Sequence, residues 1–308
     1  MPATIVKDFL TVQSAGPRPK TRLCVCVNRH LKTVAGGVIP MSQVRVTGTA
    51  WGRRLEDYAY TGGLDGPGWA WEFLRRNGRF LCDCRLSRAG LPVEIKHVSG
   101  AIYLRPRRRF LRAEAWGLML FPDPAKSSTD TPVFWHPEAL KNHINGTVTH
   151  ANENTDETLS LQDFACQRMV LASNRTEHVT IRSAQKSARF SLAGQSILIG
   201  KSKCVFQIEG LSRVERVAAT LRNLRKLREQ SAPSTHHHSQ FETHLRNYLV
   251  ALDGHLAVRS YRDIAEVIYG VGRVKSVWTH ETRHLKEGMR RAVNRGIQFM
   301  EGAYRTLL

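Results

Sequence analysis

The sequence predicts an α+β fold, made of a small aromatic-rich N-terminal module, a small antiparallel sheet and a C-terminal group of helices. Three observations lead to this prediction. Tryptophan and tyrosine gather between residues 51 and 71, short apolar runs broken by turn residues follow from residue 165, and apolar residues recur at helical spacing from residue 211 onward. An apolar content of 42% is enough for a sizeable core.

The charge of the chain is strongly positive and limits the choice of partners. Its 308 residues include 46 Lys and Arg against 26 Asp and Glu, a formal net charge of +20. Such a field attracts polyanions, chiefly nucleic acid or an anionic membrane surface. No apolar run approaches the roughly 18 residues that a spanning helix needs, and residues 1–40 show no signal-peptide pattern. We therefore expect no membrane partner and a cytoplasmic, nucleoid-associated protein.

The first segment, residues 1–50, is predicted to be a poorly ordered basic extension. It alternates short apolar runs with Gly, Pro and Ser and shows no sustained period. Recognisable pattern begins only at Trp51, so one hypothesis places the biological start at Met41.

The second segment, residues 51–150, is predicted to be an aromatic-rich regulator module. Gly and Pro near residues 62–68 mark a loop, and "WAWEFLRRN" after it indicates a short helix. Its aromatic residues are expected in the core. The alternative is an RNA-binding protein, in which "WAWEF" would be exposed and would stack on unpaired bases. The polar stretch "NENTDETLSLQD" predicts a domain boundary near residue 155, before a third domain at 160–308.

The sequence shows no recognisable catalytic or metal-binding pattern. It lacks a phosphate-binding glycine loop with Lys, a His-Glu-x-x-His motif and a Gly-x-Ser-x-Gly motif, so we expect no enzyme, no catalytic residues and no cofactor. The pairs Cys24/Cys26 and Cys82/Cys84 have only one residue between them, so they and the lone Cys166 and Cys204 are predicted to be reduced structural thiols. The adjacent His236, His237 and His238 are predicted to lie in a linker rather than to bind a metal.

Four or five strands and one helix are predicted next. The runs "CQRMVLA", "EHVTIRS", "ARFSLAG", "SILIG" and "CVFQIEG" are separated by Gly or polar residues, which is typical of a small antiparallel sheet. Residues 211–229 place Leu211 and six further apolar residues on one helical stripe. The opposite face carries Arg222, Arg225 and Arg228, a possible second contact surface for phosphates.

Three amphipathic helices are predicted from residue 240 onward. The first has an apolar face that starts at Phe241. In the second, Ser260 and Asp263 form a capping-box pattern, Tyr269 completes the apolar face, and Gly270 ends the helix. The third starts near Thr279. Residues 271–278 make the connection between the last two longer than that of a simple helix-turn-helix, so the pair is predicted to be a variant of that motif.

The third helix combines an apolar face with a basic one. Leu285, Met289, Val293 and Met300 repeat at core spacing, which leaves a stripe of Lys, Arg and Asn outward. Such a stripe can bond phosphates and read base edges in the major groove of duplex DNA, although a solvated face of an ordinary bundle has the same composition. The candidate DNA-binding residues are Lys275, Trp278, Thr279, His280, Arg283, Lys286, Arg290, Arg291 and Asn294.

Several of these motifs resemble a proteobacterial family of transcriptional regulators. "SYRDIAEVIYG", "LKEGMRRAVNRG", "FMEG" and "YRTLL" are similar to the C-terminal helix-turn-helix variant domain of FseA-type activators and QseM-type antiactivators of integrative and conjugative elements. "DYAYTGGLDGPGWAWEFLRRN" and "PVFWHPE" resemble the N-terminal module that often accompanies this domain, so the resemblance spans 51–308.

The resemblance implies an activator of the excision and transfer genes of a mobile element. RNA polymerase and a small antiactivator protein are the partners it implies besides duplex DNA. The alternative is a protein-protein interaction module that acts as an antiactivator by sequestering a related regulator.

Overall fold

The computed structural model describes residues 51–87, 94–151, 158–183, 186–229, 239–278 and 283–308, without the side chains of His150 and Arg283. These residues belong to one compact unit, Arg45–Leu308. The predictions for residues 1–50, for Met41 and for the three adjacent histidines lie outside the described residues.

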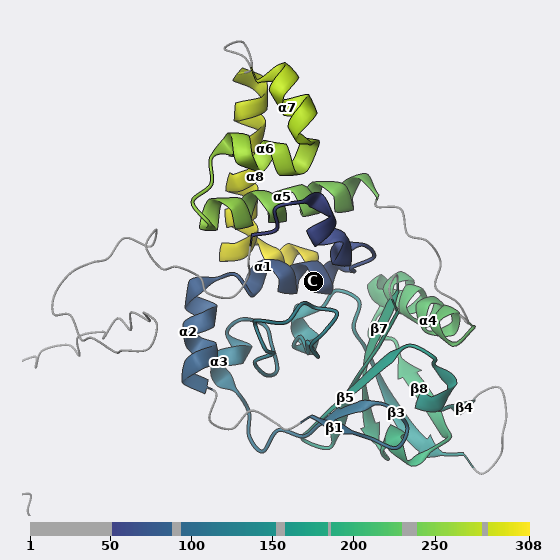
Figure 1. The fold of residues 1–308 in the computed structure, drawn as a ribbon. Coiled ribbons are helices and arrows are strands. Elements are labelled where there is room, and N and C mark those ends of the chain that lie inside the picture. The colour runs from purple at the N-terminus through teal and green to yellow at the C-terminus, as the bar shows by residue number, and fades with distance from the viewer. Residues whose placement is uncertain (1–50, 88–93, 152–157, 184–185, 230–238, 279–282) are drawn as a thin grey trace, which may run out of the picture. The chain divides into compact units, whose positions relative to one another are not determined.

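The fold is α+β, as predicted. The helices are α1 (Gly66–Leu74), α2 (Gly78–Ser87), α3 (Leu111–Glu114), α4 (Val214–Glu229), α5 (Gln240–Leu256), α6 (Tyr261–Tyr269), α7 (Val271–Val277) and α8 (Arg283–Glu301) (Figure 1). The strands are β1 (Ile95–Lys96), β2 (Ile102–Leu104), β3 (Ile144–His150), β4 (Thr158–Leu159), β5 (Gln167–Ser173), β6 (Thr176–Arg182), β7 (Ser187–Gly194) and β8 (Ser202–Gln207). Short 3-10 turns include η2 (Leu55–Thr61), η6 (Leu211–Arg213) and η7 (Ala303–Leu307).

The sheet is larger than predicted and mixed in direction. Its eight strands have the order β1-β2-β5-β6-β7-β3-β8-β4, and the β2/β5 and β3/β7 pairs are parallel. Strands β1, β2 and β3 come from before residue 155, so the sheet combines chain from both sides of the expected boundary. Whether the chain folds as separate domains at that boundary stays a prediction.

Helix α4 covers one face of the sheet and completes the first of two cores. Val217, Leu224 and Leu227 are buried with sheet residues such as Phe190. Leu211 was predicted on the same stripe but is 91% exposed, because it lies in η6 before the α-helix begins. The stripe is therefore one turn shorter than the sequence suggests.

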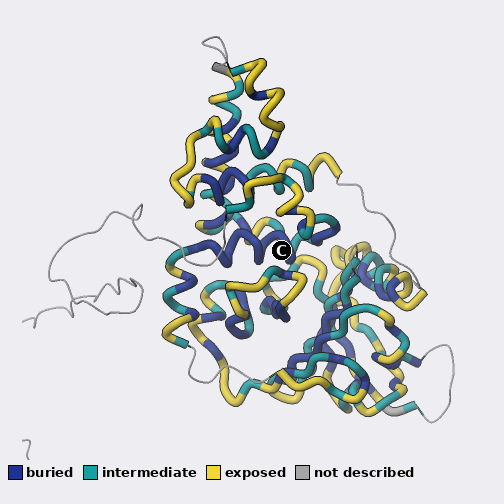
Figure 2. The backbone as a smooth tube through the Cα atoms, viewed as in Figure 1, coloured by how far each residue is buried: buried dark blue, intermediate teal, exposed yellow. Residues whose placement is uncertain are grey.

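The second core joins the N-terminal module to the C-terminal helices. Trp69, Trp71 and Phe73 of α1 are at most 1% exposed, as predicted for core residues, and α1 is buried along nearly its whole length (Figure 2). The RNA alternative needs exposed aromatic rings at "WAWEF", so burial of these rings removes its basis. Phe73 stacks on Phe299 of α8 at a ring distance of 4.8 Å.

Helices α5, α6 and α8 pack around one another through the predicted apolar faces. Met289 and Val293 of α8 are each 2% exposed, and Ile264 of α6 is fully buried. Phe241 and Tyr269 were predicted on these faces but are 61% and 38% exposed, because both lie at helix ends.

The start and end of α6 are as predicted, but the following connection is not. The Ser260 hydroxyl accepts a hydrogen bond from the Asp263 amide, and the Asp263 carboxylate accepts one from the Ser260 amide. Gly270 ends the helix with φ of 88°, a conformation that costs little only for glycine. The predicted connection then forms a separate helix, α7, whose Val274 is fully buried.

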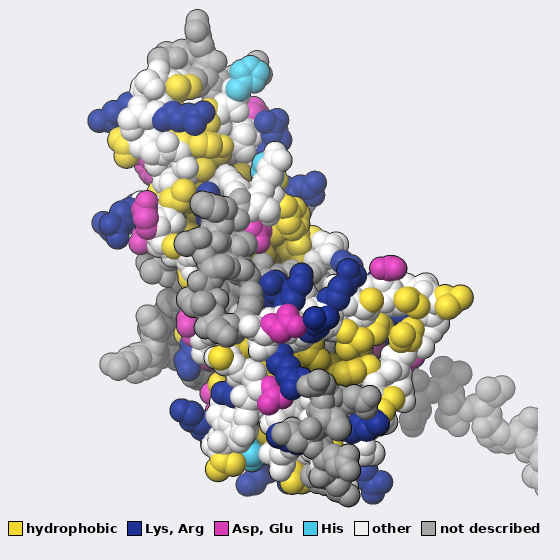
Figure 3. Space-filling model, turned by 90° about the vertical axis from the view of Figure 1, so that its right-hand side faces the viewer, with side chains coloured by type: hydrophobic (Ala, Val, Ile, Leu, Met, Phe, Trp, Pro, Cys, Tyr) yellow, Lys and Arg dark blue, Asp and Glu magenta, His cyan; other side chains and the backbone are white. Residues whose placement is uncertain are grey.

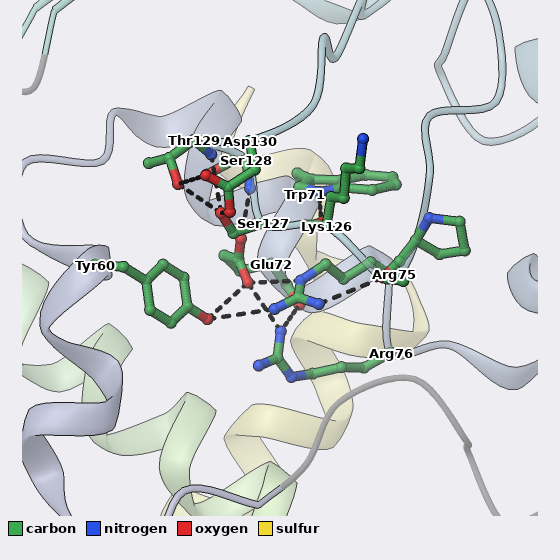
Figure 4. Close-up of polar contacts among 12 residues, drawn as sticks. Tyr60, Trp71, Glu72, Arg75, Arg76, Lys126, Ser127, Ser128, Thr129 and Asp130 are labelled. Carbon is green, nitrogen blue, oxygen red and sulfur yellow. Dashed lines mark hydrogen bonds and ion pairs between the residues drawn. The ribbon is translucent and has the colours of Figure 1, made fainter.

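A buried ionic network surrounds Glu72 on α1 (Figure 4). Its carboxylate accepts hydrogen bonds from Tyr60, from the Arg75 Nε at 2.7 Å, from Arg76 at 3.0 Å and from the Ser128 amide at 2.8 Å. Burial alone would raise the pKa of Glu72, but the two guanidinium groups and these hydrogen bonds lower it below its usual value. Glu72 is therefore ionised although it is fully buried.

Arg76 extends this network to α5. Its Nε and second terminal nitrogen donate to the two carboxylate oxygens of Asp253 at 2.5 and 2.8 Å, and the Tyr58 hydroxyl donates to the same carboxylate at 3.1 Å. Arg76 and Asp253 are 2% and 3% exposed. A bidentate buried pair of this kind fixes the relative position of α1 and α5.

A second ionic contact joins the start of α1 to β7. The Asp65 carboxylate caps the helix by accepting from the Gly68 amide at 2.9 Å, and it also accepts from Arg189 at 2.5 Å and from the Ser187 hydroxyl. Burial would raise the pKa of Asp65, but the Arg189 charge and these hydrogen bonds lower it to about 2. Helix α1 is thus tied both to the sheet and to the C-terminal helices.

Two glycines in α8 differ in how much space their surroundings leave for a side chain. A Cβ atom at Gly296 would lie 2.6 Å from the Tyr248 carbonyl oxygen, whereas a Cβ at Gly288 would meet no atom of the described residues within 4 Å. We expect Gly296→Ala to lower the free energy of unfolding by about 1–3 kcal/mol through overpacking. Gly288→Ala should raise it by about 0.5–1 kcal/mol through lower unfolded-state entropy. Urea denaturation measures both, and a loss of stability in the Gly288 variant would contradict the geometry.

Removing one carboxylate from the buried network should cost far more than removing one from the surface. Asp253→Asn leaves Arg76 buried with one of its two anionic partners missing, so the free energy of unfolding should fall by about 3–5 kcal/mol. The control is Glu266→Gln, which removes a carboxylate from an exposed pair with Arg262 and should cost less than about 1 kcal/mol. Similar losses for both variants in thermal or urea unfolding would show that the network adds no special stability.

Candidate nucleic-acid interface

Helix α8 has one face in the core and one face in solvent. Leu285, Met289, Val293 and Gly296 face α5 and α6 and are buried or half-buried. Because a helix turns by 3.6 residues, the remaining positions must point outward. Those exposed positions are His284, Lys286, Arg290, Arg291, Asn294, Arg295, Gln298 and Glu301.

The candidate residues taken from the sequence are placed as follows. Lys275 is exposed on α7, and Trp278, at the end of α7, is half-buried and packs against the helical core. Thr279 and His280 lie outside the described residues, as does the side chain of Arg283. The structure therefore brings Lys286, Arg290, Arg291 and Asn294 together on one exposed helix surface, which we call the α8 face.

One cation of the α8 face has a carboxylate partner within the same helix. Arg290 Nε donates to Glu287 at 3.0 Å, and both side chains are about half exposed. Such an exposed pair contributes about 0–1 kcal/mol, so a phosphate could replace the carboxylate at little cost. Within the described part of the chain, Lys286 and Arg291 form no ion pair. The α8 face therefore keeps a net positive charge.

Helix α7 adds polar residues that the sequence analysis missed. Arg273 and Ser276 are exposed beside Lys275, and the Arg273 guanidinium lies 5.7 Å from the centre of the Tyr269 ring. The signal was present in the three-residue spacing of Val271, Val274 and Val277, but two turns are too few to distinguish a helix from a loop.

The basic face of α4 is more neutralised than the α8 face. Arg225 donates to Glu229 at 2.7 Å, and Arg228 lies 3.6 Å from Asp163, while Arg222 is exposed. Lys and Arg side chains are also spread over much of the surface seen in Figure 3, so charge alone does not single out one helix. A second phosphate-contact surface on α4 stays a prediction.

The described residues form no group of three or more potential metal ligands. No disulfide joins the cysteines among them, and burial raises the pKa of the Cys204 thiol to about 11. No helix within the described ranges is long and apolar enough to cross a membrane.

Two regions of the chain match known protein families. Residues 204–308 match the family described as "T6SS, Transcription factor, DNA binding domain". Residues 51–121 match the family described as "Proteobacterial transcriptional regulator-like domain". No curated protein matches the chain. The first of these regions contains α5 to α8, and the second contains α1 and α2. These matches support a DNA-binding transcriptional regulator.

The pair between Arg290 and Glu287 should weaken DNA binding. Glu287→Gln removes a carboxylate that repels phosphates and holds Arg290, so DNA affinity should rise roughly fivefold, as about 1 kcal/mol of surface electrostatics implies. The control is Glu301→Gln, the same charge change at an exposed position at the far end of α8, which should have less effect. Fluorescence anisotropy with a labelled duplex measures both. An equal gain in both variants would show that only net charge matters.

Proposed function

We propose that this protein is a sequence-specific transcriptional regulator that binds duplex DNA through the α8 face, together with Lys275 on α7. The observation that carries the proposal is the two-sided character of α8. Its apolar side is fixed in the core, so its Lys, Arg and Asn side chains are held outward on a rigid helix within the segment that matches a DNA-binding domain.

The dimensions of α8 suit the major groove. With 19 residues it is about 28 Å long, and a helix of about 10–12 Å diameter enters a groove about 12 Å wide. Lys286 and Arg291 are suited to phosphate contacts, which set position and register. Asn294 and Arg290 carry side chains that can bond adenine and guanine edges bidentately, so we assign base reading to them.

The resemblance to FseA-type regulators favours an activator of excision and transfer genes of a mobile element. An activator of this kind acts through RNA polymerase, which makes polymerase a proposed partner, with a small antiactivator as a proposed inhibitor. The family matched by residues 204–308 carries the description T6SS, so secretion genes are the alternative target. Mapping of bound sites across the genome distinguishes the two, because the sites would lie upstream of different genes.

The alternative of an antiactivator that sequesters a related regulator fits the α8 face less well. A surface that captures the basic face of a related regulator would carry acidic or apolar side chains at this helix. The described exposed residues of α8 instead include four Lys and Arg and one carboxylate, Glu301.

The proposal is tested by removing the cations of the α8 face. The combined change Lys286→Ala, Arg290→Ala and Arg291→Ala should weaken binding to the specific site at least about 100-fold, because each of these side chains contributes about 1–3 kcal/mol. The slope of log affinity against log salt should become shallower by up to about 0.9 for each phosphate that the variant no longer binds. Thermal unfolding should change little, since all three side chains are exposed. Quantitative footprinting over a salt series gives both values.

A matched control removes the same charge elsewhere. Arg105 and Arg107, between β2 and α3, and Arg112, within α3, are exposed cations, and changing all three to Ala lowers the net charge equally. This variant should keep most of the specific affinity. Equal losses in both variants would mean that the protein attracts DNA by its overall charge, and the α8 face would not be the reading surface.

A further inference from the structure

A pocket of about 290 Å³ lies between the N-terminal module and the sheet. One wall comes from the segment before and within α3 and from residues 136–137, and the other comes from the turn between β5 and β6. Its volume is at the small end for ligand sites. It shares no residue with the α8 face, and a ligand bound here would contact both the module and the sheet. We call it the Arg108 pocket, after an arginine in its wall.

The charge of the Arg108 pocket is positive. Arg108 and Arg109 line it, and among the described lining residues the only carboxylate is Glu114. Both oxygens of Glu114 accept hydrogen bonds from Arg109, at 2.9 and 2.6 Å, and these bonds lower the pKa of Glu114. Arg109 and Glu114 therefore balance each other, and Arg108 adds a second cation to the lining.

A chain of hydrogen bonds supplies a neutral donor to the same pocket. The Ser191 hydroxyl lies 2.7 Å from His143 Nε2 and 2.6 Å from His178 Nδ1, and His178 lines the pocket. Burial lowers the pKa of both imidazoles to about 4, so both are neutral at physiological pH. A neutral imidazole carries one proton, and its position decides which nitrogen donates.

The position of that proton follows from His143. Its Nδ1 is buried and has no hydrogen-bond partner among the described residues, and an N–H without a partner is the costlier state for a buried nitrogen. His143 therefore carries its proton on Nε2 and donates it to Ser191, and Ser191 donates to His178 Nδ1. The proton of His178 is then on Nε2, the nitrogen that Ser191 does not occupy. This arrangement leaves His178, a lining residue, with an N–H donor that needs no protonation.

The turn between β5 and β6 contributes further donors in a fixed conformation. Asn174 and Arg175 have φ of 46° and 64°, a region that non-glycine residues adopt rarely. Asn174, which carries a carboxamide, and Thr176, which carries a hydroxyl, line the pocket. With Arg108, Arg109 and His178, residues that carry donors come from both walls, which suits a tetrahedral oxyanion better than a planar carboxylate.

The remaining wall is apolar. Met119, Leu171 and Pro106 line it, so a ligand there would bury a nonpolar part beside its charged group. An apolar patch beside polar and charged groups lets a small-molecule site hold both parts of such a ligand.

We propose that the Arg108 pocket binds a small phosphate monoester with an apolar or aromatic body, which makes it a ligand site of this regulator. Arg108, Asn174 and His178 bond the phosphate oxygens, and the apolar wall holds the body. The site is independent of DNA binding by the α8 face, and its test uses no DNA.

Binding is tested with the full chain and simple probes. Phenyl phosphate carries the phosphate and an aromatic body, inorganic phosphate lacks the body, phenol lacks the phosphate, and dimethyl phosphate stands for the diester of a nucleic-acid backbone. Isothermal titration calorimetry should show the tightest binding for phenyl phosphate. Equal or tighter binding of dimethyl phosphate would assign the pocket to a nucleic-acid backbone and overturn the proposal. Absence of saturable phenyl phosphate binding would also overturn it.

Two pairs of variants locate the binding to the pocket. Arg108→Gln should weaken phenyl phosphate binding roughly tenfold, as loss of a charged hydrogen bond implies, while Arg107→Gln on the same segment should change it less than about twofold. Asn174→Gly should weaken binding without loss of stability, because glycine accepts the turn conformation, and Arg175→Gly at the next position should have less effect. Equal effects within either pair would show that the probe binds by general attraction or at another place.

Discussion

The structure depends on a single arginine held between two carboxylates from distant parts of the chain. Arg76 pairs with Glu72 on its own helix and with Asp253 on α5, and all three groups are nearly inaccessible to water. A charge in such a place is tolerated only when its partners are present, so the module at 51–121 and the helices at 240–308 must assemble together. Gly66 adds to this, because its α-carbon lies so close to the Leu307 carbonyl that any side chain would collide with it.

Local features of the fold could be predicted from the sequence, and nonlocal ones could not. The apolar period of α8 and the Ser260 capping box depend on residues three or four positions apart, and both were predicted. The place of β3 between β7 and β8 depends on partner strands tens of residues away in the sequence. The alternation of apolar residues predicts a strand but does not identify its partners. The ionic network had a local signal in the spacing of Glu72, Arg75 and Arg76, but nothing in the sequence points from Arg76 to Asp253.

The outward basic surface of α8 could be predicted for a similar reason. Once Met289 and Val293 are assigned to the core, helix geometry leaves one orientation for Lys286 and Arg290. Helix α7 was missed because one apolar contact, at Val274, is enough to hold a helix of two turns but too little to form a periodic pattern. The Arg108 pocket is drawn from separate segments that only the folded chain brings together, so no linear motif describes it.

The glycine between α6 and α7, Gly270, fixes the backbone there, while the exposed side chains of α7 can vary. Gly270 takes a backbone conformation that side-chain-bearing residues rarely adopt, and it serves as the last cap of one helix and the first of the next. The angle between α6 and α7 is therefore set by the backbone at Gly270 and not by the side chains around it. Exposed positions on α7 can consequently be exchanged during evolution without reshaping the scaffold, and new binding preferences can arise by substitution of a few surface residues.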